Sequence, residues 1–116
     1  MNDPVDSVLP SAPLPRRSAE VISFLESLIE KRTQEIAEIE QMVERYERRA
    51  RKEEQAYRSM SPLRRMLAGK KPDHHVAVEY IHYVKKPLEK AKALREEIAR
   101  YRAMLDGTTP VEFTDA

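Results

Sequence analysis

The side chains with metal-ligand character lie in one short stretch of the sequence. His75, Glu79 and His82 are spaced i, i+4 and i+7, so a helix would place all three on one face. Imidazole and carboxylate groups on one face could hold a zinc or similar ion, with water completing the shell. The spacing is not that of HExxH, and histidines near a helix start are usually solvated or packed. We therefore expect no resident metal and no cofactor, and keep these three residues as the candidates.

A second group of side chains could contact phosphate or an acidic partner. Residues 45–92 carry fourteen Lys and Arg against six Asp and Glu, whereas residues 1–44 and 93–116 are both net acidic. Cations that neutralise phosphates release counterions, so this group could bind a nucleic-acid backbone. Interleaved glutamates also fit an ordinary solvated helix surface or a contact with an acidic protein. The candidate residues are Arg45, Arg48, Arg49, Lys52, Arg64, Arg65, Lys70, Lys71, Lys85 and Lys86.

Catalytic motifs are missing from the sequence. The chain has no cysteine and two glycines, and it contains no glycine-rich phosphate loop, Ser-His-Asp arrangement or nucleophile elbow. The absence of cysteine excludes disulfides and thiolate sites and suits a reducing compartment. Apolar runs extend over only a few residues, which is too short for a membrane span. We expect a cytoplasmic protein that is not an enzyme and has no membrane partner.

These side chains must be positioned by long helices, because apolar residues recur every seven positions for about forty residues. Ten of the twelve positions in this stripe are apolar, and the exceptions are Arg32 and Glu53. We expect Arg32 and Glu53 to snorkel, to fix the register, or to pair with Glu97 or Glu79. The stripe consists of Ile22, Leu25, Ile29, Arg32, Ile36, Ile39, Val43, Tyr46, Ala50, Glu53, Tyr57 and Met60.

Capping residues place the ends of the first helix and of a short one that follows. Ser18 can accept hydrogen bonds from the first turn, which predicts a helix over about 18–59. Ser61 followed by Pro62 predicts a short helix over 62–68, closed by Gly69.

A second long helix is expected over 73–106. Asp73 is the predicted N-cap and Gly107 the predicted end. Its apolar seam consists of Ala77, Tyr80, Val84, Pro87, Ala91, Leu94, Ile98, Tyr101 and Leu105. Pro87 predicts a kink in this helix, with a full break at Lys86 as the alternative.

The expected fold is all-α: an antiparallel helical hairpin, or coiled coil, over 18–107. A Pro-rich flexible arm (1–17) precedes it and a tail (108–116) follows it. Apolar residues beside the seams make each stripe wider than one helix pair needs. The flanking residues are Leu28 and Met42 on the first helix, and Ile81, Tyr83 and Leu88 on the second. We therefore expect a homodimer, packed as a four-helix bundle, or a higher homo-oligomer.

The start of the first helix should overhang the second helix. Val21, Phe24 and Leu25 would then lack partners on it, and Val111 and Phe113 of the tail are the nearest residues that could cover them. The predicted partner-binding surface consists of Ile22, Phe24, Leu25 and Leu28.

Two functions of different class fit these patterns. The first is a non-enzymatic assembly or adaptor protein that mediates protein–protein interaction through self-association and a basic tip. The second is a nucleic-acid-binding protein that contacts phosphates through the same tip. Shape alone does not choose between them.

Overall fold

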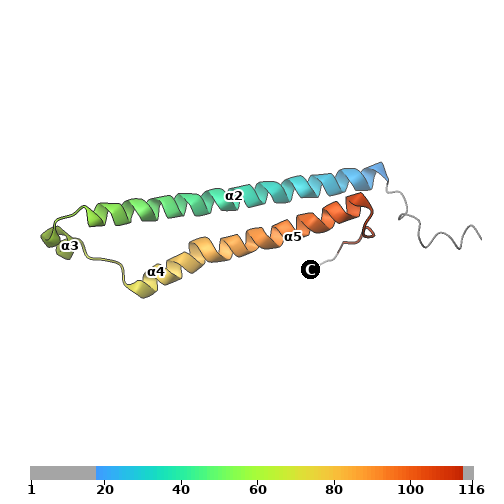
Figure 1. Ribbon diagram of the computed structural model, residues 1–116. Coiled ribbons are helices and arrows are strands. Elements are labelled where there is room, and N and C mark those ends of the chain that lie inside the picture. The colour runs from blue at the N-terminus through green and yellow to red at the C-terminus, as the bar shows by residue number, and fades with distance from the viewer. Residues whose placement is uncertain (1–17, 114–116) are drawn as a thin grey trace, which may run out of the picture. The chain divides into compact units, whose positions relative to one another are not determined.

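A computed structural model describes residues 18–113, and these residues form helices and connecting turns without a strand (Figure 1). The helices are α2 (Ala19–Arg58), α3 (Pro62–Ala68), α4 (Asp73–Tyr80) and α5 (Lys86–Asp106). A π-helical segment, η2 (Ile81–Lys85), joins α4 to α5. The expected Pro-rich arm over 1–17 lies outside the described residues. Among the described helices, none is long and apolar enough to cross a membrane.

The starts of α2 and α3 are capped as the sequence predicts. The Ser18 Oγ accepts a hydrogen bond from the Val21 amide at 3.2 Å. The Ser61 Oγ accepts one from the Arg64 amide at 3.3 Å, and Pro62 occupies the first turn of α3. Each serine satisfies an amide that has no partner within its helix.

The glycines predicted to end helices have positive φ angles, 74° at Gly69 and 80° at Gly107. After α5, the Thr108 amide donates to the Ala103 carbonyl at 3.0 Å and the Gly107 amide donates to the Met104 carbonyl at 3.3 Å. This pair of bonds is a Schellman motif, which uses carbonyls left free at a helix end. Glycine adopts positive φ without the steric cost that other residues meet, so both ends follow from local sequence.

The prediction that Asp73 caps the second long helix is wrong. Pro72 occupies the cap position with φ −58° and ψ 147°, and no side chain caps this end. Asp73 is the first helical residue, and the Val76 amide bonds to the Pro72 carbonyl at 3.2 Å. The proline ring already fixes a φ suited to a helix entry, so the helix begins at Asp73, one residue earlier than a cap at Asp73 would imply. Asp73 still favours the positive end of the helix dipole.

The helical path continues through Pro87, so the full break at Lys86, which was the alternative to a kink, does not occur. The Lys86 amide bonds to the Ile81 carbonyl five residues back, and φ and ψ stay helical at Tyr80, Ile81 and Lys86. Proline has no amide hydrogen and its ring collides with the carbonyl four residues earlier. A π-turn widens the helix by one residue before Pro87, which makes room for the ring.

The chain divides into two compact units, and α2 and α5 each contribute to both. Unit 1 holds the described residues 18–33 and 95–113. Its buried residues are Leu25, Ile98 and Met104, of which Met104 was not expected in the seam. Phe24 contacts Phe113 and Arg32 contacts Glu97. From the first of these contacts to the second, the residue number increases on α2 and decreases in the C-terminal part of the chain. The pairing is therefore antiparallel.

Unit 2 comprises Gln34–Leu94. Tyr46 of α2 stacks on Tyr83 of η2, with ring centroids 4.9 Å apart and planes 16° apart. Lys71 lies 3.9 Å from Glu53, so this pairing is antiparallel as well. The buried residues all fall at predicted seam positions: Ile36, Ile39, Val43, Val84, Ala91 and Leu94. Both units are therefore consistent with the expected helical hairpin.

Candidate interaction surfaces

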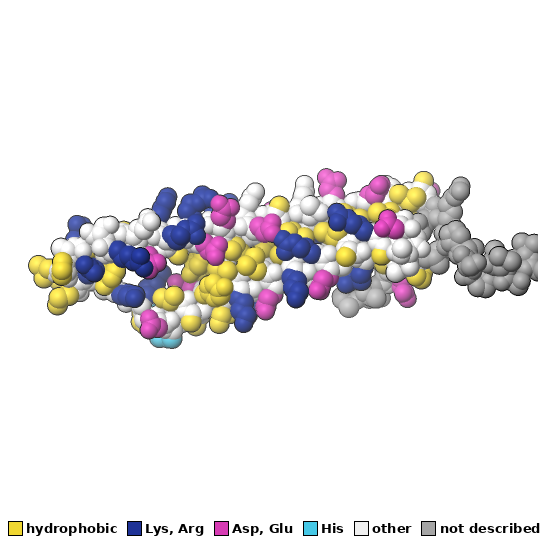
Figure 2. All heavy atoms as spheres, in the orientation of Figure 1, with side chains coloured by type: hydrophobic (Ala, Val, Ile, Leu, Met, Phe, Trp, Pro, Cys, Tyr) yellow, Lys and Arg dark blue, Asp and Glu magenta, His cyan; other side chains and the backbone are white. Residues whose placement is uncertain are grey.

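Residues 59–81, here called the tip segment, contain α3 and α4 but no buried residue. On α3, Leu63 is 68% exposed and Met66 and Leu67 are both 80% exposed. Figure 2 shows hydrophobic and basic side chains together at this end of unit 2. Apolar side chains gathered on an exposed helix are typical of interaction surfaces. The sequence showed an apolar edge on this helix but not that all of it faces solvent.

Near α3, the charged side chains of the tip segment are all positive. Residues 59–72 include four cations and no carboxylate. The Arg65 Nε donates to the Met60 carbonyl at 3.1 Å, so this side chain helps to hold the turn between α2 and α3. Arg64 and Lys70 are exposed. The surface around α3 is therefore both apolar and positively charged.

Lys71 does not contribute to that surface. Its side chain contacts Glu79 and Glu53 and interacts electrostatically with Tyr46, and we call these four residues the Lys71 cluster. The Lys71 Nζ lies 3.2 Å from both carboxylate oxygens of Glu79, and the hydrogen bond to Glu79 raises the pKa of Lys71. Burial, followed by the charge of Glu79, raises the pKa of Tyr46. Because these contacts tie the α3–α4 connection to α4 and α2, Lys71 is a structural residue in this arrangement.

A groove of about 640 Å³ lies beside the Lys71 cluster. Its walls include the aromatic rings of Tyr46, Tyr57 and Tyr83. Its charged lining residues are the cations Arg49, Lys70 and Lys71 and the carboxylates Glu53, Glu54, Asp73 and Glu79. Carboxylates outnumber cations there, so the groove itself is unsuited to a phosphate chain.

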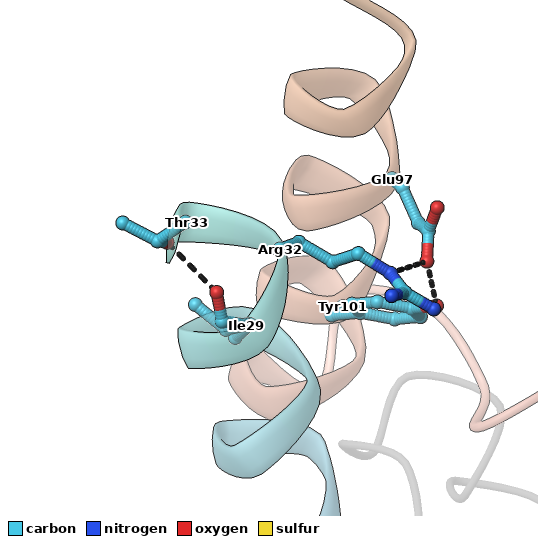
Figure 3. Close-up of polar contacts among 5 residues, drawn as sticks. All are labelled: Ile29, Arg32, Thr33, Glu97 and Tyr101. Carbon is cyan, nitrogen blue, oxygen red and sulfur yellow. Dashed lines mark hydrogen bonds and ion pairs between the residues drawn. The ribbon is translucent and has the colours of Figure 1, made fainter. Parts of the chain in front are cut away.

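In unit 1, Arg32, Glu97 and Tyr101 form the Arg32 cluster (Figure 3). The Arg32 Nε donates to Glu97 Oε2 at 2.7 Å, which confirms the predicted pairing, and the Tyr101 hydroxyl donates to the same oxygen. Partial burial acts to raise the pKa of Glu97, but the bonds from Tyr101 and Arg32 together hold it below 4.5. Burial, then the bond to Glu97, raises the pKa of Tyr101. These contacts fix the alignment of two helices.

The predicted partner-binding surface at the start of α2 is only partly covered by the chain itself. Leu25 is 0% exposed and therefore cannot contact a partner, which corrects its assignment. Leu28 is half-buried, while Ile22 and Phe24 stay exposed. The Phe24 ring meets the Phe113 ring edge-on at 5.5 Å, as expected for a tail that covers the overhang. Because Phe113 covers part of Phe24, the start of α2 leaves less apolar surface for a partner than the sequence indicates.

All ten predicted phosphate-contacting residues lie in unit 2, but they do not form one free patch. Arg48 pairs with Glu44 at 2.5 Å, and Lys71 and Arg65 are engaged as described above. The remaining residues are exposed: Arg45, Arg49, Lys52, Arg64, Lys70, Lys85 and Lys86.

The metal candidates are not brought together. Within residues 18–113, no three His, Asp or Glu side chains lie where they could share a metal ion. Glu79 pairs with Lys71, and the His82 ring packs edge-on against Tyr83 at 4.7 Å. His75 lies against His74, with ring centroids 4.2 Å apart.

The geometry therefore offers an exposed apolar and basic tip, two polar clusters that align helices, and a net acidic groove. No family model, curated protein or solved structure matches this chain.

Proposed function

We propose that this chain is a non-enzymatic assembly or adaptor protein. It self-associates, and its α3 tip docks onto a protein surface that is both apolar and acidic. The observation that carries the proposal is the exposure of Leu63, Met66 and Leu67 beside Arg64 and Lys70, without a carboxylate in residues 59–72.

The energetics of α3 support a role in docking. A seven-residue helix is far below the length at which an isolated helix is stable in water, and α3 buries nothing. The capping residues at its two ends define where α3 begins and ends, but they do not cover its apolar side chains. A partner that covers Leu63, Met66 and Leu67 would gain about 25 cal/mol for each Å² of apolar surface removed from water. Arg64 and Lys70 would steer an acidic partner toward this site and speed its association.

A photo-crosslinking side chain at position 66 of the full chain tests this function in cells. We expect one discrete adduct with a second protein, which mass spectrometry identifies. The same group at Glu30, an exposed position on α2, is the control and should give no such adduct. Arg64→Glu with Lys70→Glu should reduce the adduct. A chain that crosslinks equally from both positions, or from neither, contradicts the proposal.

Nucleic-acid binding is the second candidate, because residues 59–72 carry four cations and no carboxylate. It predicts that affinity for short DNA or RNA falls by orders of magnitude between low and moderate salt. Arg64→Glu with Lys70→Glu should abolish that binding, whereas Leu63→Ser with Leu67→Ser should leave it intact. The docking function predicts loss of partner binding in both pairs of variants. Filter binding across a salt series distinguishes the two.

A further inference from the structure

The charge of α2 changes sign near its middle. Residues 19–44 carry seven carboxylates and two cations, whereas residues 45–58 carry six cations and three carboxylates. An exposed apolar strip lies at this boundary. Met42 is 52% exposed, Tyr46 follows one turn later on the same side of α2, and Tyr83, 49% exposed, stacks on Tyr46. We call Met42, Tyr46 and Tyr83 the Met42 strip.

We propose that a second copy of this chain covers the Met42 strip, with the two α2 helices antiparallel about a two-fold axis near Met42. This inference rests on the self-association in the proposed function and names its surface. After Phe24, Met42 is the one large hydrophobic residue of α2 that is strongly exposed. Figure 2 shows hydrophobic side chains gathered over η2 and the start of α5, on the side that adjoins α2.

Charge complementarity favours a second copy of the chain as the partner and favours an antiparallel orientation of its α2 helix. Steps of three and four residues from Met42 identify the charged positions on the same side of α2. In an antiparallel pair, positions equally far before and after Met42 face each other. This arrangement opposes Glu35 to Arg49, brings Glu38 near Arg45, and opposes Lys31 to Glu53 of the other copy. The two-fold axis repeats each contact, as an isologous interface requires.

Other arrangements of two copies oppose like charges. A parallel pair places Arg49 against Arg49 and Glu38 against Glu38. A pair joined at the tips places the cations of residues 59–72 against themselves. Within the described chain, Glu38, Arg45 and Arg49 make no ion pair, so all three are available to a second copy.

Disulfide trapping tests the interface, because the chain has no cysteine of its own. Met42→Cys in the full chain should form a disulfide-linked dimer on mild oxidation. Ser27→Cys and Ala56→Cys are exposed positions on the same side of α2, fifteen residues before and fourteen after Met42. Each alone should stay unlinked, while an equal mixture of the two should crosslink. Ser27→Cys linking to itself would overturn the antiparallel arrangement.

Charge reversal provides a second readout that needs no crosslink. Glu38→Arg and Arg45→Glu should each weaken dimerisation about tenfold, since each change creates two like-charge contacts across the axis. The double variant should recover most of the wild-type dissociation constant, measured by sedimentation. A double variant as weak as the single ones would overturn the pairing.

Light scattering of the wild-type chain separates failure of this inference from failure of the proposed function. A stable monomer at high micromolar concentration would overturn self-association and this interface together. A dimer in which position 42 does not crosslink and the mixed pair stays apart would overturn only the Met42 strip.

Discussion

Arg32 and Lys71 each bring a cation to a glutamate and a tyrosine from another part of the chain, but their surroundings differ. The Arg32–Glu97 contact is 2.7 Å long, its side chains are 31% and 22% exposed, and its unit buries Leu25, Ile98 and Met104. The Lys71–Glu79 contact is 3.2 Å long, its side chains are 54% and 34% exposed, and it joins a segment that buries nothing. The Arg32 cluster lies beside buried core residues, whereas the Lys71 cluster joins a segment whose side chains remain exposed.

The largest expected difference is in the free energy of unfolding, and it compares a leucine in the core of unit 1 with a leucine in the tip segment. Leu25→Ala should lower the free energy of unfolding by about 2–5 kcal/mol, because it leaves a cavity at a fully buried site. Leu67→Ala removes the same atoms from an exposed site and should stay within about 0.5 kcal/mol. Urea denaturation measures both. Equal losses would mean that α3 is packed in solution.

The cations of the two clusters should differ next. Arg32→Ala leaves the half-buried Glu97 carboxylate without its charged donor and should cost about 1.5–3 kcal/mol. Lys71→Ala exposes carboxylates that already face water and should leave the free energy of unfolding unchanged. A double-mutant cycle of Arg32→Ala with Glu97→Gln isolates the coupling. A Lys71 variant as unstable as the Arg32 variant would show that the two clusters act alike.

A smaller effect is expected where the tail covers unit 1. The Phe113 ring packs edge-on against Phe24 and lies 6.4 Å from the Tyr101 ring. Phe113→Ala should lower the free energy of unfolding by about 0.5–1.5 kcal/mol. The matched variant Phe113→Leu keeps most of the apolar area, so it should lose less. Thermal unfolding compares the two, and an unchanged melting temperature in Phe113→Ala would exclude a packing role.

The smallest expected effect is the pH dependence of the Arg32 cluster. The folded chain lowers the pKa of Glu97 from its ordinary value, so the carboxylate stabilises the fold fully at pH values above that ordinary value. This contribution should decline as the pH falls through the lowered pKa of the folded state. Glu97→Gln should flatten that part of the stability profile, measured by thermal unfolding across acidic pH. An identical profile in this variant would show that Glu97 does not contribute.

Sequence reasoning predicted the parts of this fold that depend on local chemistry. Ser18, Ser61, Gly69 and Gly107 act through atoms within a few residues of themselves, so their roles followed from position alone. Seam positions such as Ile36 and Leu94 followed from the seven-residue period. The Arg32–Glu97 pair was one of the three alternatives that the sequence left open for a charged residue within an apolar stripe.

What sequence reasoning missed depends on neighbours that are distant in the chain. Leu25 lies in the seven-residue stripe, but its burial depends on which residues cover the start of α2, and the pattern of α2 does not identify them. The engagement of Lys71 depends on the path of the α3–α4 connection, which brings it to Glu79 and Glu53. The π-turn before Pro87 is one of several ways to accommodate a proline, and the sequence does not choose among them.

That π-turn also sets the rotational phase of everything before it. Each residue of an α-helix advances the helix by roughly 100°, so the extra residue in η2 turns α4 by about a quarter of a revolution relative to an unbroken α-helix. Ala77 and Tyr80, which the seven-residue period assigns to the seam, are exposed, whereas Val84 within η2 and Ala91 after it are buried. Deleting one residue between Ile81 and Lys85 would realign the two halves and rotate Tyr80 inward. The one inserted position therefore determines which side of α4 faces the core.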